Sequence, residues 1–333
     1  MADSSLAILL LIIAFAIGFG LVNGFNDAAN AIAASIGARA LSPRNAVMLA
    51  ATFNFAGAAT GLAVARTIGK GILIPGAISN ETVLAGLAAV IVWGSLATYW
   101  GLPVSITHSF VTGLAAAGAA LVGVDAIQWG VIGRIGSSVV IAPVLGFIGG
   151  FIVLIILLWI FRRSAPYGMR IVFSRLQWLT SAFLAYSHGK NDGQMPIGVI
   201  TMALVIYYNQ PSLWDNIPFW VIGISALAIS SGMAIGGWRV IRTLGLRVTT
   251  LQPVHGFAAN FSAATVIEVA SQLGIPVSTT HCASSAIMGV GATRRVSAVR
   301  WGVAGNIVAA WILTFPICGV LGYFFAWLLG MVF

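Results

Sequence analysis

Two Asn-Asp pairs in apolar surroundings are the first residues in this sequence that suggest chemistry. They are Asn26-Asp27 and Asn191-Asp192. An aspartate inside a membrane costs about 2.5–3.5 kcal/mol on insertion scales, so a repeated one indicates function. Each pair follows a glycine, which favours an unwound helix with free carbonyl oxygens. Carbonyl, amide and carboxylate oxygens are hard ligands for a small cation. The alternative is that both aspartates only cap the helices that follow them.

Two Pro-Val-Ser-x-Thr-His blocks, at 103–108 and 276–281, have the residue types that bind an anion. Each proline suits the first turn of a helix, where its missing N–H has no partner to lose. A helix N-terminus with added hydroxyl donors is a ready anion site, and two such termini could replace the hydration of a tetrahedral oxyanion. The alternative is that the hydroxyls bond only their own helices. The hydroxyls are those of Ser105, Thr107, Ser278, Thr279 and Thr280.

Charge balance connects the two kinds of motif. Two carboxylates and an anion cannot share a low-dielectric pocket without compensating positive charge. Lys190 is the only basic side chain close to the motifs in the sequence, and one charge is too few. Bound Na⁺ or protons on the carboxylates must supply the rest. The residues therefore predict transport of an anion coupled to a cation.

Five further titratable residues lie near the motifs or inside apolar stretches. His108 and His281 end the two anion blocks, where they could donate protons or, as neutral rings, bond a helix carbonyl. His188 and His255 have no counterpart in the other half of the chain, so we expect structural roles for them. Glu268 also lacks a counterpart and is a candidate for gating.

Four blocks of sequence recur in the same order in the two halves of the chain, which indicates an internal duplication. They are 24–27 and 189–192, 66–69 and 242–245, 101–108 and 274–281, and 129–131 and 301–303. We expect a first repeat over 1–161, a basic linker over 162–170 and a second repeat over 171–333. Duplication on this scale is typical of secondary transporters. Charge counting alone leaves parallel and inverted repeats both open.

The composition identifies the elements that must position these motifs. Only 7% of the 333 residues are charged and 59% are hydrophobic, with a mean hydropathy of +1.02. Soluble domains carry about 25% charged residues. Several apolar runs reach the roughly 20 residues that a crossing needs, so about 10–12 transmembrane segments fit. The sequence predicts an all-α polytopic membrane protein.

The expected helices are broken at the motifs. Both Asn-Asp pairs and both Pro-Val-Ser blocks should lie at breaks that open further apolar segments. The stretches 5–38, 129–161 and 301–333 are each too long for one crossing and contain Gly, Asn or Pro, so we expect interruptions there as well. The chain should therefore contain discontinuous helices.

The charge distribution and the cysteines exclude other classes of protein. The net charge of +9 comes from basic residues in short gaps between apolar runs, which is the positive-inside pattern of a multi-pass protein of the cell membrane. These residues should contact lipid headgroups, and no nucleic-acid partner is expected. The apolar run from Leu6 to Val22 lacks a basic start and predicts a retained span. Cys282 and Cys318 indicate packing, without a disulfide.

The chain resembles the inorganic phosphate transporter (PiT) family over nearly its whole length. The resemblance rests on Gly-x-Asn-Asp-x-x-Asn at 24–30, Ser-His-Gly-x-Asn-Asp at 187–192 and the two Pro-Val-Ser-x-Thr-His blocks. It implies two inverted repeats with discontinuous or re-entrant helices, and a homodimer. It also implies import of inorganic phosphate by alternating access, driven by Na⁺ or H⁺ and without a cofactor.

The resemblance also assigns roles to residues at matching positions. It implies cation sites at Asn26, Asp27, Asn191 and Asp192. It implies a phosphate site at Ser105, Thr107, Ser278, Thr279 and Thr280, with Asn30 and Gln194 lining the pocket.

Three residues depart from the family pattern and keep other functions open. Ile106 and Met195 stand where members usually or often have Thr and Lys, and Asn260 stands where many have Glu. These changes bear on the coupling ions and leave a sulfate transporter of the same fold as an alternative. An uncoupled anion channel would not need paired buried aspartates. A hydrolase using Ser105 or Ser278 would need one asymmetric nucleophile and base, so duplication argues against an enzyme.

Overall fold

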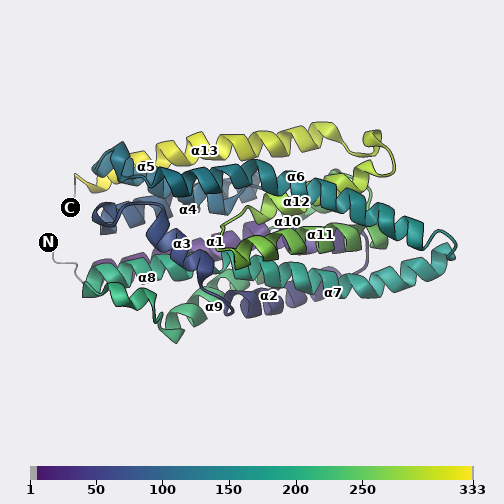
Figure 1. Ribbon diagram of the computed structural model, residues 1–333, viewed down its shortest axis with the longest axis horizontal. Coiled ribbons are helices and arrows are strands. Elements are labelled where there is room, and N and C mark those ends of the chain that lie inside the picture. Colours follow the sequence, from purple (N-terminus) through teal and green to yellow (C-terminus); the bar gives the residue numbers. More distant parts are fainter. Residues whose placement is uncertain (1–5, 332–333) are drawn as a thin grey trace.

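The computed structural model describes residues 6–331, and over that range it is helical without β-strands (Figure 1). This confirms the expected all-α fold. The α-helices, in chain order, are α1 (Leu6–Gly37), α2 (Pro43–Ala58), α3 (Ala63–Gly71), α4 (Asn80–Trp100), α5 (Ile106–Leu121), α6 (Trp129–Ile160), α7 (Pro166–Asp192), α8 (Gln194–Tyr208), α9 (Phe219–Ile235), α10 (Trp238–Arg242), α11 (Pro253–Gln272), α12 (Thr279–Ala292) and α13 (Trp301–Leu329).

The first Asn-Asp pair lies inside a continuous helix, so the predicted break at that pair is wrong. Helix α1 runs without interruption through Asn26 and Asp27. The reason lies in the neighbouring helix: a Cβ on Gly24 would stand 2.0 Å from the carbonyl oxygen of Ile229 in α9. The glycine therefore permits close helix packing and does not unwind the chain. The second pair does end a helix, since α7 stops at Asp192 and α8 begins at Gln194.

The long stretches 129–161 and 301–333 were also expected to be interrupted, but Trp129–Ile160 and Trp301–Leu329 each form one long helix. Helices α6 and α13 continue through Pro143 and Pro316 respectively. Proline is tolerated within membrane helices because neighbouring groups satisfy the freed backbone carbonyl. The expected break in these stretches is therefore wrong.

Both Pro-Val-Ser blocks do lie at breaks, between α4 and α5 and between α11 and α12. Gly101 and Gly274 follow α4 and α11, the helices before the breaks, with φ of 74° and 68°, a conformation that favours glycine. Ser105 and Ser278 then cap the N-termini of α5 and α12, the helices after the breaks. Because the serine is the cap, each helix begins one residue after it. Pro103 and Pro276 lie before the caps, which corrects their expected place in the first turn.

Fewer helices than the predicted 10–12 segments are, taken singly, long and apolar enough to cross a membrane. In the described range, four helices are long and apolar enough to cross a membrane, and two bent helix pairs would raise the number to six. The bends are 67° between α2 and α3 and 59° between α9 and the helical segment after Gly237. Several apolar stretches instead form short arms such as α5 and α12, of 16 and 14 residues, below the roughly 20 residues of a crossing.

The two repeats interleave in space. Helices α6 and α13 occupy equivalent places in the repeats but run in opposite directions along the molecule (Figure 1). Helix α12 of the second repeat packs along α6 of the first, and α5 of the first packs along α13 of the second. We call α4 with α5 the first hairpin and α11 with α12 the second hairpin, and the Pro-Val-Ser blocks are their tips. Each hairpin is thus held by a long helix of the other repeat. Opposite helix directions are the relation that inverted repeats require.

The outer surface of the long helices is apolar. Side chains such as Ile155 and Trp159 of α6 and Ile312 and Phe324 of α13 are exposed. Such a surface matches the hydrocarbon of a bilayer. The protein is therefore a multi-pass integral membrane protein, as its composition predicts. Cys282 and Cys318 are buried and unpaired, also as expected.

Candidate functional site

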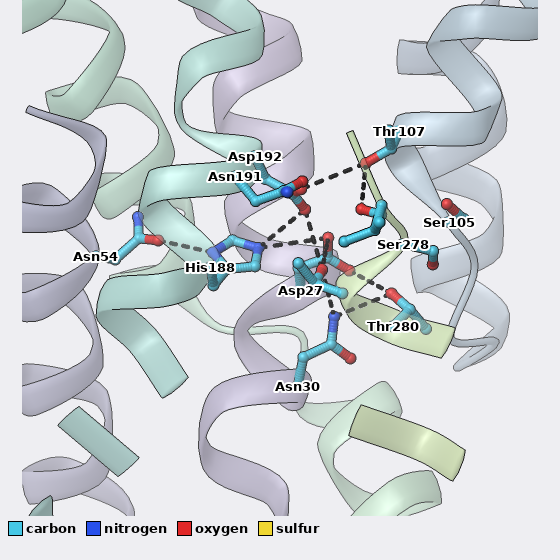
Figure 2. Close-up of polar contacts among 12 residues, drawn as sticks. Asp27, Asn30, Asn54, Ser105, Thr107, His188, Asn191, Asp192, Ser278 and Thr280 are labelled. Atoms are coloured by element: carbon cyan, nitrogen blue, oxygen red, sulfur yellow. Dashed lines mark hydrogen bonds and ion pairs between the residues drawn. The ribbon is translucent and has the colours of Figure 1, made fainter. Parts of the chain in front are cut away.

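A buried cluster of two carboxylates and one imidazole lies where α1 and α7 meet. The Nε2 atom of His188 is 3.5 Å from Asp27 Oδ2 and 3.2 Å from Asp192 Oδ2. One ligand atom from each of the three residues lies within 4.8 Å of the others, and all three residues are buried. Figure 2 shows their side chains pointing toward one another. His188, for which only a structural role was expected, thus lies in the centre of the cluster.

The Nδ1 atom of His188 has a partner outside the carboxylate cluster, and this partner bears on the protonation of the ring. His188 Nδ1 lies 2.7 Å from Asn54 Oδ1, and the Asn54 amide nitrogen donates to Ser230 Oγ at 3.2 Å. When Nδ1 donates to the Asn54 oxygen, a neutral ring turns the lone pair of Nε2 toward two carboxylates. The cluster therefore needs a further proton or a cation between these atoms.

Threonines from both hairpin tips contact the carboxylates. Thr280 Oγ1 donates to Asp27 Oδ1 at 2.8 Å, and Thr107 Oγ1 donates to Asp192 Oδ1 at 3.3 Å (Figure 2). Thr279 Oγ1 lies 3.0 Å from Asp192 Oδ2 and 3.4 Å from Asp27 Oδ2. The groups predicted to bind a cation and those predicted to bind an anion thus form one continuous site.

Each tip also reaches the backbone of the other. Thr107 Oγ1 lies 3.4 Å from the carbonyl oxygen of Val277, and Thr280 Oγ1 lies 3.0 Å from that of Val104. These two contacts are equivalent under the duplication. A pseudo-twofold arrangement therefore brings the two hairpin tips together at the carboxylates.

The asparagines of the two pairs hold the hairpins in place. The side-chain amide of Asn26 donates to Thr98 Oγ1 at 2.6 Å, and the amide of Asn191 lies 3.0 Å from Ser271 Oγ. Thr98 and Ser271 are in the last turns of α4 and α11, directly before the breaks. Asn26 and Asn191 were predicted as cation ligands, and these contacts also give them a positioning role.

Asn30 contacts the threonines of the cluster, whereas Gln194 points elsewhere. Asn30 Nδ2 donates to Thr280 Oγ1 at 2.9 Å, and its buried Oδ1 has no hydrogen-bond partner in the described chain. Gln194 Oε1 accepts from the backbone N–H groups of Val64 and Ala65, at 2.9 and 3.2 Å. Its amide nitrogen donates to a backbone carbonyl as well. Gln194 therefore ties α8 to α3 and makes no hydrogen bond to the carboxylate cluster, which corrects its predicted place in the pocket lining.

The two serines of the anion blocks serve first as helix caps. Ser105 Oγ accepts from the N–H of His108 at 3.2 Å, and Ser278 Oγ accepts from the N–H of His281 at 3.1 Å. An Oγ that accepts in this way still has its own O–H to donate. The expectation that hydroxyls bond their own helices holds for the acceptor side of these two serines.

Four other titratable residues of the motif helices lie in two pairs. The rings of His108 and His281 are adjacent, with centroids 5.2 Å apart, and His281 stacks on Trp311 at 4.0 Å. Lys190 donates to Glu268, so the one basic side chain near the motifs already has an acidic partner. The carboxylate cluster itself therefore has no lysine or arginine partner in residues 6–331.

The arrangement of hydroxyls and carboxylates between two hairpin tips can be compared with known proteins. A model of the phosphate transporter family matches residues 23–172 and 162–322, so it matches the chain twice. The chain belongs to the phosphate transporter family. It is 40% identical over 324 residues to a probable low-affinity inorganic phosphate transporter of Rhizobium meliloti, covering 96% of each chain.

Two further comparisons support this membership. A probable low-affinity inorganic phosphate transporter of Bacillus subtilis is 39% identical over 333 residues, with 99% of this chain and all of the relative covered. A solved structure titled "The sodium-dependent phosphate transporter" superimposes with a TM-score of 0.90 at 29% identity, covering 98% of this chain. The resemblance found from the motifs is thus confirmed, and both the fold and the family of this chain are those of transporters.

Proposed function

We propose that this protein is a secondary transporter that imports inorganic phosphate together with Na⁺ or H⁺ by alternating access. One observation carries the proposal: Asp27 and Asp192 are buried side by side and are bonded by threonines from both hairpin tips. A membrane protein keeps two aspartates together only where something positive shares the site.

The anion half of the proposal rests on the threonines and the helix ends. Helices α5 and α12 begin at the cluster, so their first N–H groups and the hydroxyls of Thr107, Thr279 and Thr280 lie beside it. Helix N-termini favour anions. Protonated phosphate also donates a hydrogen bond and needs an acceptor, which a carboxylate supplies and which sulfate would not use. Membership in a phosphate transporter family supports phosphate over sulfate.

The cation half rests on Asp27, Asp192 and His188. Carboxylate, hydroxyl and amide oxygens are suitable ligands for Na⁺, and the structural relative is described as sodium-dependent. His188 between the carboxylates offers a place for a proton as well. Either cation would neutralise the carboxylates while a phosphate binds next to them, which is the physical origin of coupling.

Burial favours alternating access over an open channel. Asp27, Asp192, Thr107 and Thr280 are each at most 1% exposed. A permeation path of a channel would leave such groups in contact with water. A site enclosed between two hairpins requires the hairpins or the bent helix pairs to move before an ion can leave.

The decisive experiment is uptake of labelled phosphate and labelled sulfate into proteoliposomes, with Na⁺ and pH gradients imposed separately. We expect phosphate, and not sulfate, to accumulate above equilibrium under one of the two gradients. Which gradient drives uptake identifies the coupling ion. Failure of phosphate to accumulate under either gradient would refute the proposal.

The expected homodimer and the inverted orientation in the membrane stay predictions. Cross-linking in membranes and impermeant labelling of cysteines placed in the linker and near the start of α1 would test them. A dimer should give one cross-linked species of twice the mass. The linker and the start of α1 should be labelled from opposite sides, because an odd number of crossings per repeat places them there.

A further inference from the structure

Within residues 6–331, a lysine–glutamate ion pair lies beside the second hairpin, and none lies beside the first. Lys190 Nζ donates to Glu268 Oε1, joining the end of α7 to the last turns of α11. Lys190 directly precedes Asn191, and Glu268 lies one turn before Ser271, which contacts Asn191. The pair therefore covers the contact that holds the second hairpin.

The duplication identifies the matching positions in the first repeat. Lys190 corresponds to Phe25, since 189–192 matches 24–27. The contact between Asn191 and Ser271 matches the one between Asn26 and Thr98. Three residues before Thr98 is Ser95, which therefore corresponds to Glu268. The first repeat thus has an aromatic residue and a serine where the second has an ion pair.

These matching positions line a surface pocket. Phe25, Ser95 and Thr98 line a cavity of about 330 Å³ whose wall also includes Arg239. Thr98, at the inner end of this set, is 9% exposed, whereas Ser271 behind the ion pair is 1% exposed. The approach to the first hairpin is thus more open than the approach to the second.

Similar bent helices cover both approaches, so the difference between the approaches lies in their side-chain contacts. Thr67 of α3 donates to the carbonyl oxygen of Gly274 at 2.8 Å, and Thr243 after α10 donates to that of Gly101 at 2.9 Å. On the second side, Gln194 further connects the backbone of Lys190 to the start of α3. The second side therefore has the ion pair and the Gln194 bonds, whereas on the first side Arg239 donates to the carbonyl oxygen of Tyr99 at the end of α4.

We infer that the Lys190–Glu268 pair is a latch that closes one side of the site, and that the Phe25–Ser95 pocket is the access path on the other side. The latch must separate when its side opens. Arg239 in the pocket wall gives an approaching anion a positive charge to meet. This inference rests on the proposed transport function, since a protein that does not transport needs no alternating latch.

Cysteine labelling tests the latch without measuring transport. Thr98→Cys and Ser271→Cys are matched reporters, prepared separately in a Cys282→Ala, Cys318→Ala background so that no native thiol reacts. The purified protein is treated with a charged methanethiosulfonate reagent, and the labelling rate is followed by mass. We expect Thr98→Cys to react faster than Ser271→Cys.

Removing the pair should expose only the second reporter. Glu268→Gln should raise the labelling rate of Ser271→Cys by up to about fivefold, which corresponds to about 1 kcal/mol for a partly exposed ion pair. The matched control, Ser95→Ala with Thr98→Cys, should leave its rate unchanged. Exchanging the charges, with Lys190→Glu and Glu268→Lys together, should restore slow labelling.

Two results would overturn the latch. One is equal labelling of the two reporters when the pair is intact. The other is a Ser271→Cys rate that does not change with Glu268→Gln. Should Glu268→Gln fail to fold, the charge-exchanged protein decides, because fast labelling there contradicts a latch made by the two charges. Since none of these readouts uses phosphate, the latch can fail while transport is upheld, and the reverse.

Discussion

The tips of the two hairpins are nearly identical in sequence, and they differ most where the chemistry is. Thr107 and Thr280 make equivalent bonds to a carboxylate and to the opposite backbone. Ile106 and Thr279 also correspond, but Ile106 packs in the apolar core while Thr279 contacts both carboxylates. The residues that both tips share make symmetric contacts, which we call the frame of the site. Thr279, which only the second tip has, contacts both aspartates.

The same contrast appears one turn before the aspartates. His188 lies between the two carboxylates, and the matching residue of the first repeat is Asn23. The buried Asn23 amide has no hydrogen-bond partner in the described chain. Symmetry thus places the helices, while at these two positions only the second repeat supplies a side chain that contacts both carboxylates. The following predictions test this comparison.

The largest effect is expected from the two residues that the repeats share. Asp27→Asn or Asp192→Asn removes a buried charge that its partners were arranged to meet, a loss of about 3–5 kcal/mol or roughly 100-fold and more. Phosphate accumulation in proteoliposomes should fall to the level of empty vesicles for each variant. Accumulation against a gradient in both would show that the carboxylates do not bind the coupling cation.

His188→Gln should have the next largest effect. It removes a ring that contacts both carboxylates, and bonds to charged groups are worth about 1.5–3 kcal/mol. Initial uptake should therefore fall roughly 30-fold. The matched change, Asn23→Gln in the first repeat, should alter uptake by less than about threefold. Equal losses in the two variants would contradict a special role for the second repeat.

Thr279→Val should lower phosphate uptake by about tenfold, because one hydroxyl bond to charged groups is lost while the shape is kept. Ile106→Val is the matched change in the first repeat and removes only one methylene, at about 0.5–1.5 kcal/mol of stability. It should leave the half-saturating phosphate concentration unchanged. A shift of that concentration in Ile106→Val as large as in Thr279→Val would place the anion equally on both tips.

The smallest effects should be equal in the two repeats. Thr98→Val and Ser271→Ala each remove one bond that holds a hairpin, worth about 1 kcal/mol. Thermal unfolding in detergent should shift by similar amounts for both, since the frame is symmetric. A loss confined to one variant would mean that the two equivalent bonds do not stabilise their hairpins equally.

The sequence predicted the meeting of the two motif types because duplication marked them. Matched Asp27 and Asp192, and matched Thr107 and Thr280, do lie in one cluster. The predicted unwinding at Gly24 was wrong because a glycine that loosens an isolated helix also lets another helix approach, and here Ile229 of α9 fills that space. Local pattern could not distinguish these two uses.

His188 was missed for the opposite reason. Its place four residues before Asp192 puts both side chains on one face of α7, which was a usable signal. Because His188 has no repeat partner, a search for duplicated chemistry excluded it. Hydropathy alone also does not separate a full span from a short apolar helix such as α12.

The bond of each aspartate to a threonine of the other half has a consequence for the origin of the chain. Asp27 is bonded by Thr280, and Asp192 by Thr107, so neither half alone contains a complete site. Two copies of a single half would have to assemble about a twofold axis to complete such a site. Fusion makes that encounter intramolecular and raises the effective concentration of the partner half. It also allows each half to mutate by itself, which a pair of identical copies can never do.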